Sequence, residues 1–180
     1  MNRLFQKNFE IIDRKIVEHR NWFHIPKTKA EVLYIAPHIY KGRDKYLPDG
    51  TVIKRGDLLA GIHIDNQKIK NMNINIKAIL RLLDDELNCL SYAIVADTRF
   101  KDIKAFHGKT LFYPFLKREG FMIVDLDFSL NLLFVKSWEK MLRKTYSKNK
   151  IRKRVNREIK EFWITNDQLM DRRNRIGNEL

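Results

Sequence analysis

Residues 47–66, LPDGTVIKRGDLLAGIHIDN, decide the fold of the central part of this chain. They open on Pro48-Asp49-Gly50, where proline presets the backbone of a turn and glycine accepts the positive φ that other residues resist. A second glycine-centred turn at 54–57 separates two apolar runs, 52–53 and 58–65, in which strand-forming residues prevail. The stretch therefore predicts a β-hairpin or meander.

A long helix is predicted directly after this stretch, over 74–96. Apolar residues recur there at alternating steps of four and three, which places them on one helical face. They are Ile76, Leu80, Leu83, Leu87, Leu90 and Ile94. We expect this helix to cross the sheet as the main core helix. The spacing of Phe5, Phe9, Ile12 and Ile16 predicts a first amphipathic helix.

The remaining elements complete an α+β pattern. Short strands are predicted at 31–40, 103–106, 121–126 and 161–164. Pro37 indicates a sheet edge, a bulge or a strand end. A helix is predicted over 110–119 with Gly120 as its C-terminal cap, and Thr165 with Gln168 forms a capping box that opens a last short helix. This order predicts a single mixed or antiparallel sheet with a central hairpin or meander, packed by a long core helix and flanking helices.

The composition indicates one folded domain over 1–180. A chain of 180 residues with 44% hydrophobic and 11% aromatic residues can bury a core without disulfides or a structural metal. Cys89 is the one cysteine, and its place on the apolar helix suits a buried thiol rather than a nucleophile. Residues 1–23 lack the apolar run of a signal sequence, and no segment reaches the length of a membrane span. We expect a cytoplasmic protein with no cofactor and no bound metal.

Positive charge is concentrated near the C-terminus. The formal net charge is +14, and residues 136–160 hold 11 Lys and Arg residues against two acids. Such a segment indicates an anionic partner, which could be nucleic acid, an anionic lipid surface or a phosphate-bearing polymer. A solvated helix face is the alternative. The residues that would contact a polyanion are Arg143, Lys144, Lys148, Lys150, Arg152, Lys153, Arg154 and Arg157.

The densest polar group lies at the end of the predicted strand 58–65. Residues two apart on a strand share a face, so His63 and Asp65 should point to the same side. A carboxylate beside an imidazole can fix its tautomer and raise its basicity, as a general base requires. The alternative is a solvated His–Asp pair, or a buried histidine whose hydrogen bonding is satisfied by the carboxylate.

His107 offers a second imidazole where a predicted strand passes into a helix, a place where backbone N–H groups attract anions. An ordinary loop is the alternative there. His19, His24 and His38 are expected to be structural, because only His19 has an adjacent carboxylate. The chain has no G-x-G-x-x-G, Walker A, H-E-x-x-H, C-x-x-C or G-x-S-x-G motif. The candidate ligand-binding residues are Asp49, Asp57, His63, Asp65, Asn66, His107 and Thr110.

The sequence LPDGT at 47–51, followed by GD at 56–57 and IHIDN at 62–66, resembles the pattern of the YkoP-like domain family. The segments HGKT at 107–110, LKREGF at 116–121 and EFWI at 161–164 are similar to the same family. The resemblance runs from about residue 30 to 170. It implies a small bacterial protein related to the C-terminal domain of some polysaccharide deacetylases. It therefore implies a context of envelope polysaccharide metabolism, but it brings no catalytic residues and no deacetylase domain.

The order of elements is also similar to that of the GNAT acetyltransferases, in which a strand, a long helix and a second strand are followed by a helix-to-strand step like that at 111–121. Those enzymes hold the CoA pyrophosphate with a glycine-containing loop at the start of the long helix. The corresponding segment 66–72, NQKIKNM, has no glycine, which puts CoA binding in doubt.

Three functions remain open from the sequence. The first is an accessory or ligand-binding module that recognises an envelope carbohydrate precursor or a polysaccharide-modifying protein. The second is an acyltransferase that uses His63 as base, with Asp65 orienting it. The third is an electrostatic binder of nucleic acid or anionic membranes through 136–160.

Overall fold

The computed structural model describes residues 22–110, 112–125 and 160–177. The predicted helix around Phe5 to Ile16 and the basic segment up to residue 159 lie outside these residues. The strands are β1 (Phe23–His24), β2 (Leu33–Ile39), β3 (Lys45–Tyr46), β4 (Val52–Ile53), β5 (Leu58–Ile64), β6 (Ala105–Thr110), β7 (Met122–Val124) and β8 (Lys160–Thr165). The helices are α2 (Asn66–Met72), α3 (Ile76–Ala96), a short 3₁₀ turn (Thr98–Phe100), α4 (Tyr113–Arg118) and α6 (Asn166–Gly177).

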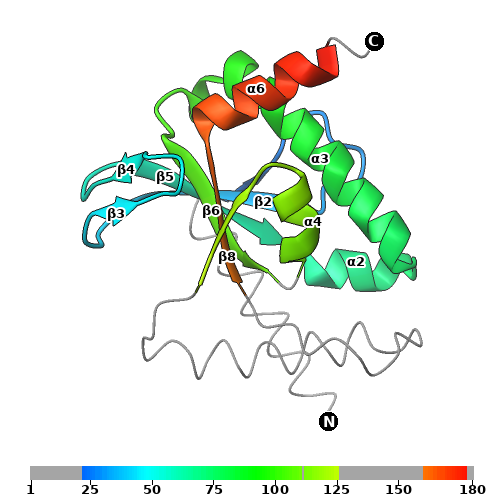
Figure 1. The fold of residues 1–180 in the computed structure, drawn as a ribbon. Helices are drawn as coiled ribbons and strands as arrows, with labels where there is room; N and C mark the ends of the chain where they lie inside the picture. Colours follow the sequence, from blue (N-terminus) through cyan, green and yellow to red (C-terminus); the bar gives the residue numbers. More distant parts are fainter. Residues whose placement is uncertain (1–21, 111, 126–159, 178–180) are drawn as a thin grey trace.

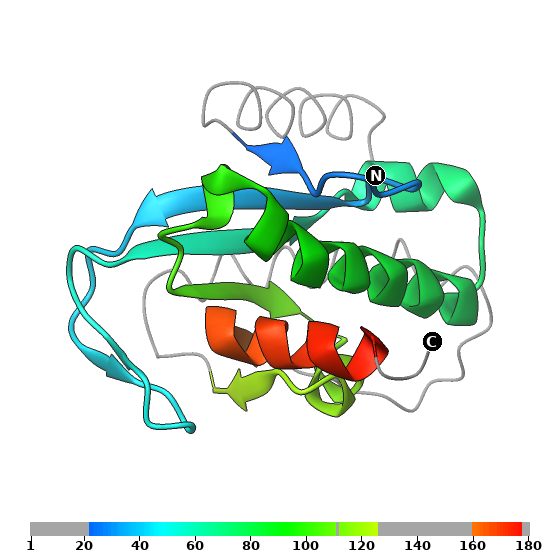
Figure 2. The same cartoon turned by 90° about the horizontal axis from the view of Figure 1, so that it is seen from above.

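Six strands form one mixed sheet in the order β1-β2-β5-β6-β8-β7. Neighbours run antiparallel except β5 and β6, which are parallel. A parallel pair needs a long crossover, and the segment containing α3 supplies it. Helices α3 and α6 lie over one face of the sheet (Figure 1, Figure 2). The α+β fold class predicted from the sequence is confirmed.

The central hairpin consists of β2 and β5, which pair over seven residues. Its connection carries β3 and β4, a separate two-stranded arm that projects from the sheet (Figure 1). At the tip of this arm Gly50 has a φ of 86°, and the N–H of Leu47 donates to the carbonyl of Thr51 at 2.8 Å. The sequence predicted 52–53 and 58–65 as strands joined by the turn at 54–57, in a hairpin or meander. Both strands are present, but they do not pair with each other, because β4 pairs with β3 and β5 pairs with β2, whose ladder is extended by the hydrogen bond from the N–H of Tyr40 to the carbonyl of Asp57.

The long core helix is confirmed as α3, which starts at Ile76, two residues after the predicted start at 74. The side chain of Asn75 caps it by accepting the N–H of Ala78 at 3.0 Å. Its apolar face packs against the sheet in the main core cluster. The buried apolar residues of this face are Ile79, Leu83, Leu87, Leu90, Ala93 and Ile94. Ile76 and Leu80, which the spacing predicted on the same face, are only partly buried.

The acidic run 84–86 on α3 spreads around the helix, as a helical run must. Glu86 turns into the core with 2% exposure and accepts the backbone N–H groups of Val32 and Leu33, each at 2.7 Å. Asp84 faces α6, where it pairs with the buried Arg172 at 2.5 Å. These two carboxylates therefore tie α3 to β2 on one side and to α6 on the other.

Strand β6 is longer than the sequence predicted. His107 and Gly108 lie within it rather than in a loop, because their backbone pairs with β8 opposite Trp163 and Phe162. Gly108 is required there, since a Cβ would lie 2.7 Å from the carbonyl oxygen of Ile62. The predicted helix over 110–119 shortens accordingly to α4.

The predicted capping box at the start of α6 is confirmed. The N–H of Thr165 donates to Oε1 of Gln168 at 3.1 Å, and the N–H of Gln168 donates to Oγ1 of Thr165 at 3.3 Å. Within the described part of the chain, none of these helices combines the length and apolar character that crossing a bilayer requires.

Candidate functional site on the histidine face

Two candidate residues from the sequence, His63 and His107, lie on the sheet face opposite α3, on neighbouring strands. Gly61 of β5 lies opposite His107 of β6, and His63 lies two residues beyond Gly61 on the same face. The alternate residues Ile62 and Phe106 point to the other side, into the core with α3. Gly61 makes room for the ring of His63, because a Cβ on Gly61 would lie 2.8 Å from its Nε2.

A third imidazole, that of His38, comes from β2 on the other edge of β5, where it lies opposite Leu59. Nε2 of His38 is 3.2 Å from Nε2 of His107, and the rings meet edge to face with centroids 5.1 Å apart. We call His38, His63 and His107 the histidine cluster. From the sequence His38 was expected to be structural, because only the strand order β2-β5-β6 brings it to a residue 69 positions away.

Two indole rings flank the histidine cluster. Trp22 stacks on His63 with centroids 4.3 Å apart, and Trp163 stacks on His107 at 4.5 Å. Trp163 is 1% exposed, and its indole N–H has no hydrogen-bond acceptor among the described residues. A buried donor without an acceptor is uncommon and costs free energy.

A charged pair borders the cluster on the side of β8. Nζ of Lys45 lies 2.6 Å from Oε2 of Glu161 and 5.0 Å from the centroid of Trp163. Oε1 of Glu161 lies 4.0 Å from Nδ1 of His107. The carboxylate of Glu161 is thus the acidic group closest to the cluster among the described contacts.

Two imidazoles of the cluster, those of His63 and His107, favour the neutral state. Burial, followed by the charges of His38, His63, Lys45 and Lys109, lowers the pKa of His107 to about 3. Burial of its ring against its neighbours, followed by the charge of His38, also lowers the pKa of His63, to about 4. Part of the His63 side chain nevertheless remains exposed. At neutral pH each of these two rings therefore presents one donor and one acceptor nitrogen.

Asp65 is held by partners other than His63. Its Oδ1 accepts the N–H of Lys68 at 2.8 Å and so caps α2, while its Oδ2 accepts the hydroxyl of Tyr34 at 3.3 Å. Asn66 is the first residue of α2. The carboxylate therefore lies at the edge of the histidine face, where it fixes the exit of β5 and the phenol of Tyr34.

The other candidate residues hold local structure away from the cluster. Asp49 accepts the N–H of Thr51 at the tip of the arm. Asp57 accepts the N–H of Lys54 and pairs with Lys104 at 2.8 Å, and the hydrogen bond from Lys104 lowers the pKa of Asp57. Thr110 points to the core side, and its hydroxyl accepts the N–H of Phe112. The eight polyanion-contacting candidates between Arg143 and Arg157 lie outside the described residues.

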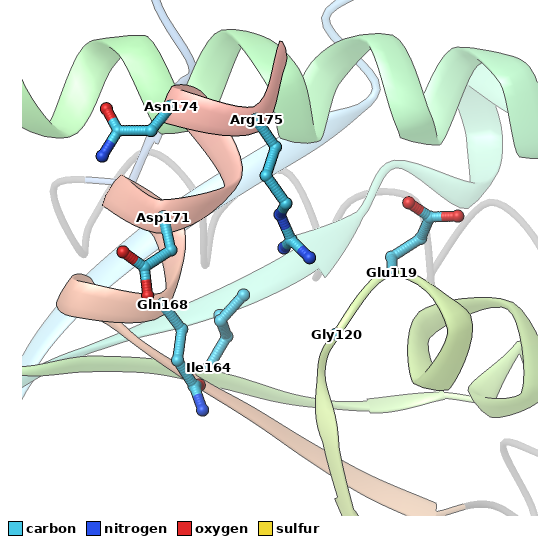
Figure 3. A pocket seen from close by; sticks show the side chains of 7 residues that line it. All are labelled: Glu119, Gly120, Ile164, Gln168, Asp171, Asn174 and Arg175. Atoms are coloured by element: carbon cyan, nitrogen blue, oxygen red, sulfur yellow. The ribbon is translucent and has the colours of Figure 1, made fainter. Parts of the chain in front are cut away.

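A second surface feature is found on the opposite side of the molecule, where α6 faces the turn after α4. It is an open hollow of about 540 Å³. Figure 3 shows Arg175 reaching from α6 towards Glu119 and Gly120 of that turn, with Gln168 and Asp171 alongside. Its charges are of both signs, with Glu119 and Asp171 opposite Arg175.

Comparison with known proteins identifies the family. Residues 2–173 match the family model described as the YkoP domain. No curated protein and no solved structure matches the chain. The match covers nearly the whole sequence, including both strands that carry His63 and His107 and the strand that carries His38. This chain therefore belongs to the YkoP domain family.

Proposed function

We propose that this protein is a ligand-binding module of bacterial envelope polysaccharide metabolism, which holds a carbohydrate or a carbohydrate-bearing precursor on its histidine face. The observation that carries the proposal is the convergence of His38, His63 and His107, from three strands, between the rings of Trp22 and Trp163.

The chemistry of this face suits a sugar. A sugar ring presents apolar C–H patches and a rim of hydroxyls, which call respectively for aromatic surface and for groups that both donate and accept hydrogen bonds. Trp22 supplies a partly exposed aromatic ring beside the exposed edge of His63. Because the rings of His63 and His107 are neutral at neutral pH, a neutral ligand can replace their water without burying an unpaired charge.

The family supports the biological setting. The motifs at 47–66 resemble those of the domain that also accompanies some polysaccharide deacetylases, as set out above. A module that holds a polysaccharide or its precursor would serve in such a context both as a separate protein and as part of a larger enzyme.

Thermal unfolding with added ligands tests the proposal. The probes are the tetramer of N-acetylglucosamine, UDP-N-acetylglucosamine and acetyl-CoA, each compared with buffer. A ligand at 100 times its Kd stabilises the folded state by about 2.7 kcal/mol, which is a clear shift in Tm. We expect the tetramer or the nucleotide sugar to raise Tm, and His63→Ala to abolish the rise.

His24→Ala is the matched control, because His24 lies on the same sheet face but packs on Tyr34, with ring centroids 4.1 Å apart, outside the histidine cluster. A rise that survives His63→Ala, or that His24→Ala abolishes equally, would contradict the placement of the ligand. No rise with either sugar probe would contradict the proposed ligand class.

Acyl transfer is a second candidate, favoured by the way β5 and β6 pair. Their ladder covers three residue pairs and ends at Gly61 and His107, although both strands continue for three more residues. An acyl donor could enter between strand ends that are not paired with each other. Two features weigh against this function: a base with a lowered pKa is weak, and the segment where a phosphate-binding loop would lie forms α2. Calorimetric binding of acetyl-CoA that His63→Ala removes would favour acyl transfer over carbohydrate binding.

A further inference from the structure

Two nitrogens of the histidine cluster face each other at short range. Nε2 of His38 and Nε2 of His107 are 3.2 Å apart, a separation at which one atom must supply a hydrogen for the contact to be attractive. What surrounds the other nitrogen of each ring decides whether such a hydrogen is available.

The other nitrogens are placed as donors. Nδ1 of His38 lies 3.1 Å from the carbonyl oxygen of Ala36, which can only accept, so Nδ1 carries the proton. Nδ1 of His107 lies 4.0 Å from Oε1 of Glu161, too far for a hydrogen bond, but the negative charge of the carboxylate favours a proton on that nitrogen. In the neutral state each Nε2 then holds a lone pair, and the two lone pairs point at one another. A metal ion between the two nitrogens removes this repulsion, as would the other tautomer of His107, in which Nε2 carries the proton.

We propose that His38 and His107 bind a divalent transition-metal ion such as Zn²⁺ through their Nε2 atoms. Zn–N bonds are about 2.0–2.1 Å long, so two imidazole nitrogens in a tetrahedral site lie about 3.3 Å apart. The observed 3.2 Å agrees with that spacing.

The surroundings are those of a histidine metal site. A metal-binding histidine usually donates its second ring N–H to a carbonyl or a carboxylate, which fixes its tautomer and orientation. Ala36 has this role for His38, and Glu161 is positioned for it beside His107. His63 lies on the intervening strand and offers the next imidazole, and water would complete the coordination.

The site is a two-histidine site as it stands. Among residues 22–110, 112–125 and 160–177, no group of three or more His, Cys, Asp or Glu side chains is arranged to hold a metal. We therefore expect modest affinity and a preference that follows the general order for nitrogen ligands, with Cu²⁺ and Ni²⁺ above Co²⁺. No metal was predicted from the sequence because known metal-binding motifs place their ligands at short spacings, whereas these two ligands are 69 residues apart.

The test is metal binding by the full chain, produced without a polyhistidine tag. Calorimetry with ZnCl₂ should give one site per chain, and Co²⁺ should give visible d–d absorption of comparable stoichiometry. His38→Ala and His107→Ala should each weaken binding at least about tenfold, since either leaves one of two protein ligands. His24→Ala is the matched control and should bind as the unaltered protein does. His38 is exposed, so its variant is expected to fold even if that of His107 does not.

Three results would overturn the proposal: no binding of Zn²⁺ or Co²⁺ at millimolar concentrations, binding that persists in His38→Ala, or binding that His24→Ala removes. The first would assign a shared proton, rather than a metal, to the contact between His38 and His107. The metal titration needs no sugar, so its failure leaves the carbohydrate proposal standing, and a failed sugar screen leaves the metal site standing.

Discussion

Replacing Glu86 by alanine tests how β2 is fastened to the core helix. The carboxylate is 2% exposed and is the hydrogen-bond acceptor for two buried backbone donors, the N–H groups of Val32 and Leu33, at 2.7 Å each. Val32 precedes β2 and Leu33 is its first residue, and neither is paired with the two-residue strand β1, which lies opposite the next two residues. Alanine at position 86 would leave both of them buried without an acceptor.

The cost follows from counting these donors. A buried donor left without a partner costs about 1–3 kcal/mol, so two cost about 2–6 kcal/mol. Alanine returns only a few tenths of a kcal/mol through its better helix propensity. We therefore expect the Glu86→Ala protein to lose about 2–5 kcal/mol of the free energy of unfolding, which a typical total of 5–15 kcal/mol can absorb.

Equilibrium unfolding in urea measures this loss, with Asp85→Ala as the control. Asp85 is the exposed neighbour on the same helix, and its replacement should change the free energy of unfolding by no more than about 0.5 kcal/mol. A loss below about 1 kcal/mol in Glu86→Ala, with an unchanged slope against urea, would refute the reasoning.

The pH dependence adds a second check of the same residue. Burial, only partly offset by the two N–H donors, raises the pKa of Glu86 above its ordinary 4.5. The folded state therefore holds this proton more tightly than the unfolded state, and stability falls as pH rises from 4.5 through the raised pKa. Because the variant lacks this group, the stability gap between the two proteins should narrow over that range.

Three further substitutions have defined outcomes. Gly108→Ala places a Cβ 2.6 Å from an aromatic ring and 2.7 Å from a carbonyl oxygen, so urea unfolding should show a loss of about 1–3 kcal/mol. Arg172→Met leaves two carboxylates without their buried partner and should lower stability by about 3–5 kcal/mol, against little change in Arg173→Met. Gly61→Ala should displace the ring of His63, whose exposed side lets it move, and so reduce ligand-induced shifts in Tm while changing the unfolding midpoint little.

Local patterns in the sequence were sufficient for most of the fold. The step of three and four residues gave α3, and the pair Thr165 and Gln168 gave the start of α6, because both signals arise within a few residues of one another. Strand pairing depends on distant residues. The apolar run after Gly56 could pair with either preceding strand, and in the structure it pairs with β2 over seven residues, a ladder that the hydrogen bond from Tyr40 to Asp57 extends.

The candidate site shows the same difference between local patterns, which the sequence reveals, and contacts between distant residues, which it does not. Alternation along a strand placed His63 and Asp65 on one side, but it could not reveal that the carboxylate would instead cap α2 and meet Tyr34. The role of Glu86 was likewise not predictable, since a carboxylate in an acidic run is ordinarily solvated, and the backbone N–H groups that donate to it lie more than fifty residues away.

The convergence of the three imidazoles depends on one residue without a side chain. His38 lies opposite Leu59 and His107 opposite Gly61, so their rings must approach each other diagonally across β5. A side chain at position 61 would take the place of the ring of His63, because its Cβ would lie 2.8 Å from Nε2 of that ring. In the sequence, a glycine within a predicted strand indicates a weakened strand. In the sheet, Gly61 leaves the space that the ring of His63 occupies. A glycine within a strand, flanked in space by histidines, is therefore the feature to seek when looking for this site in related chains.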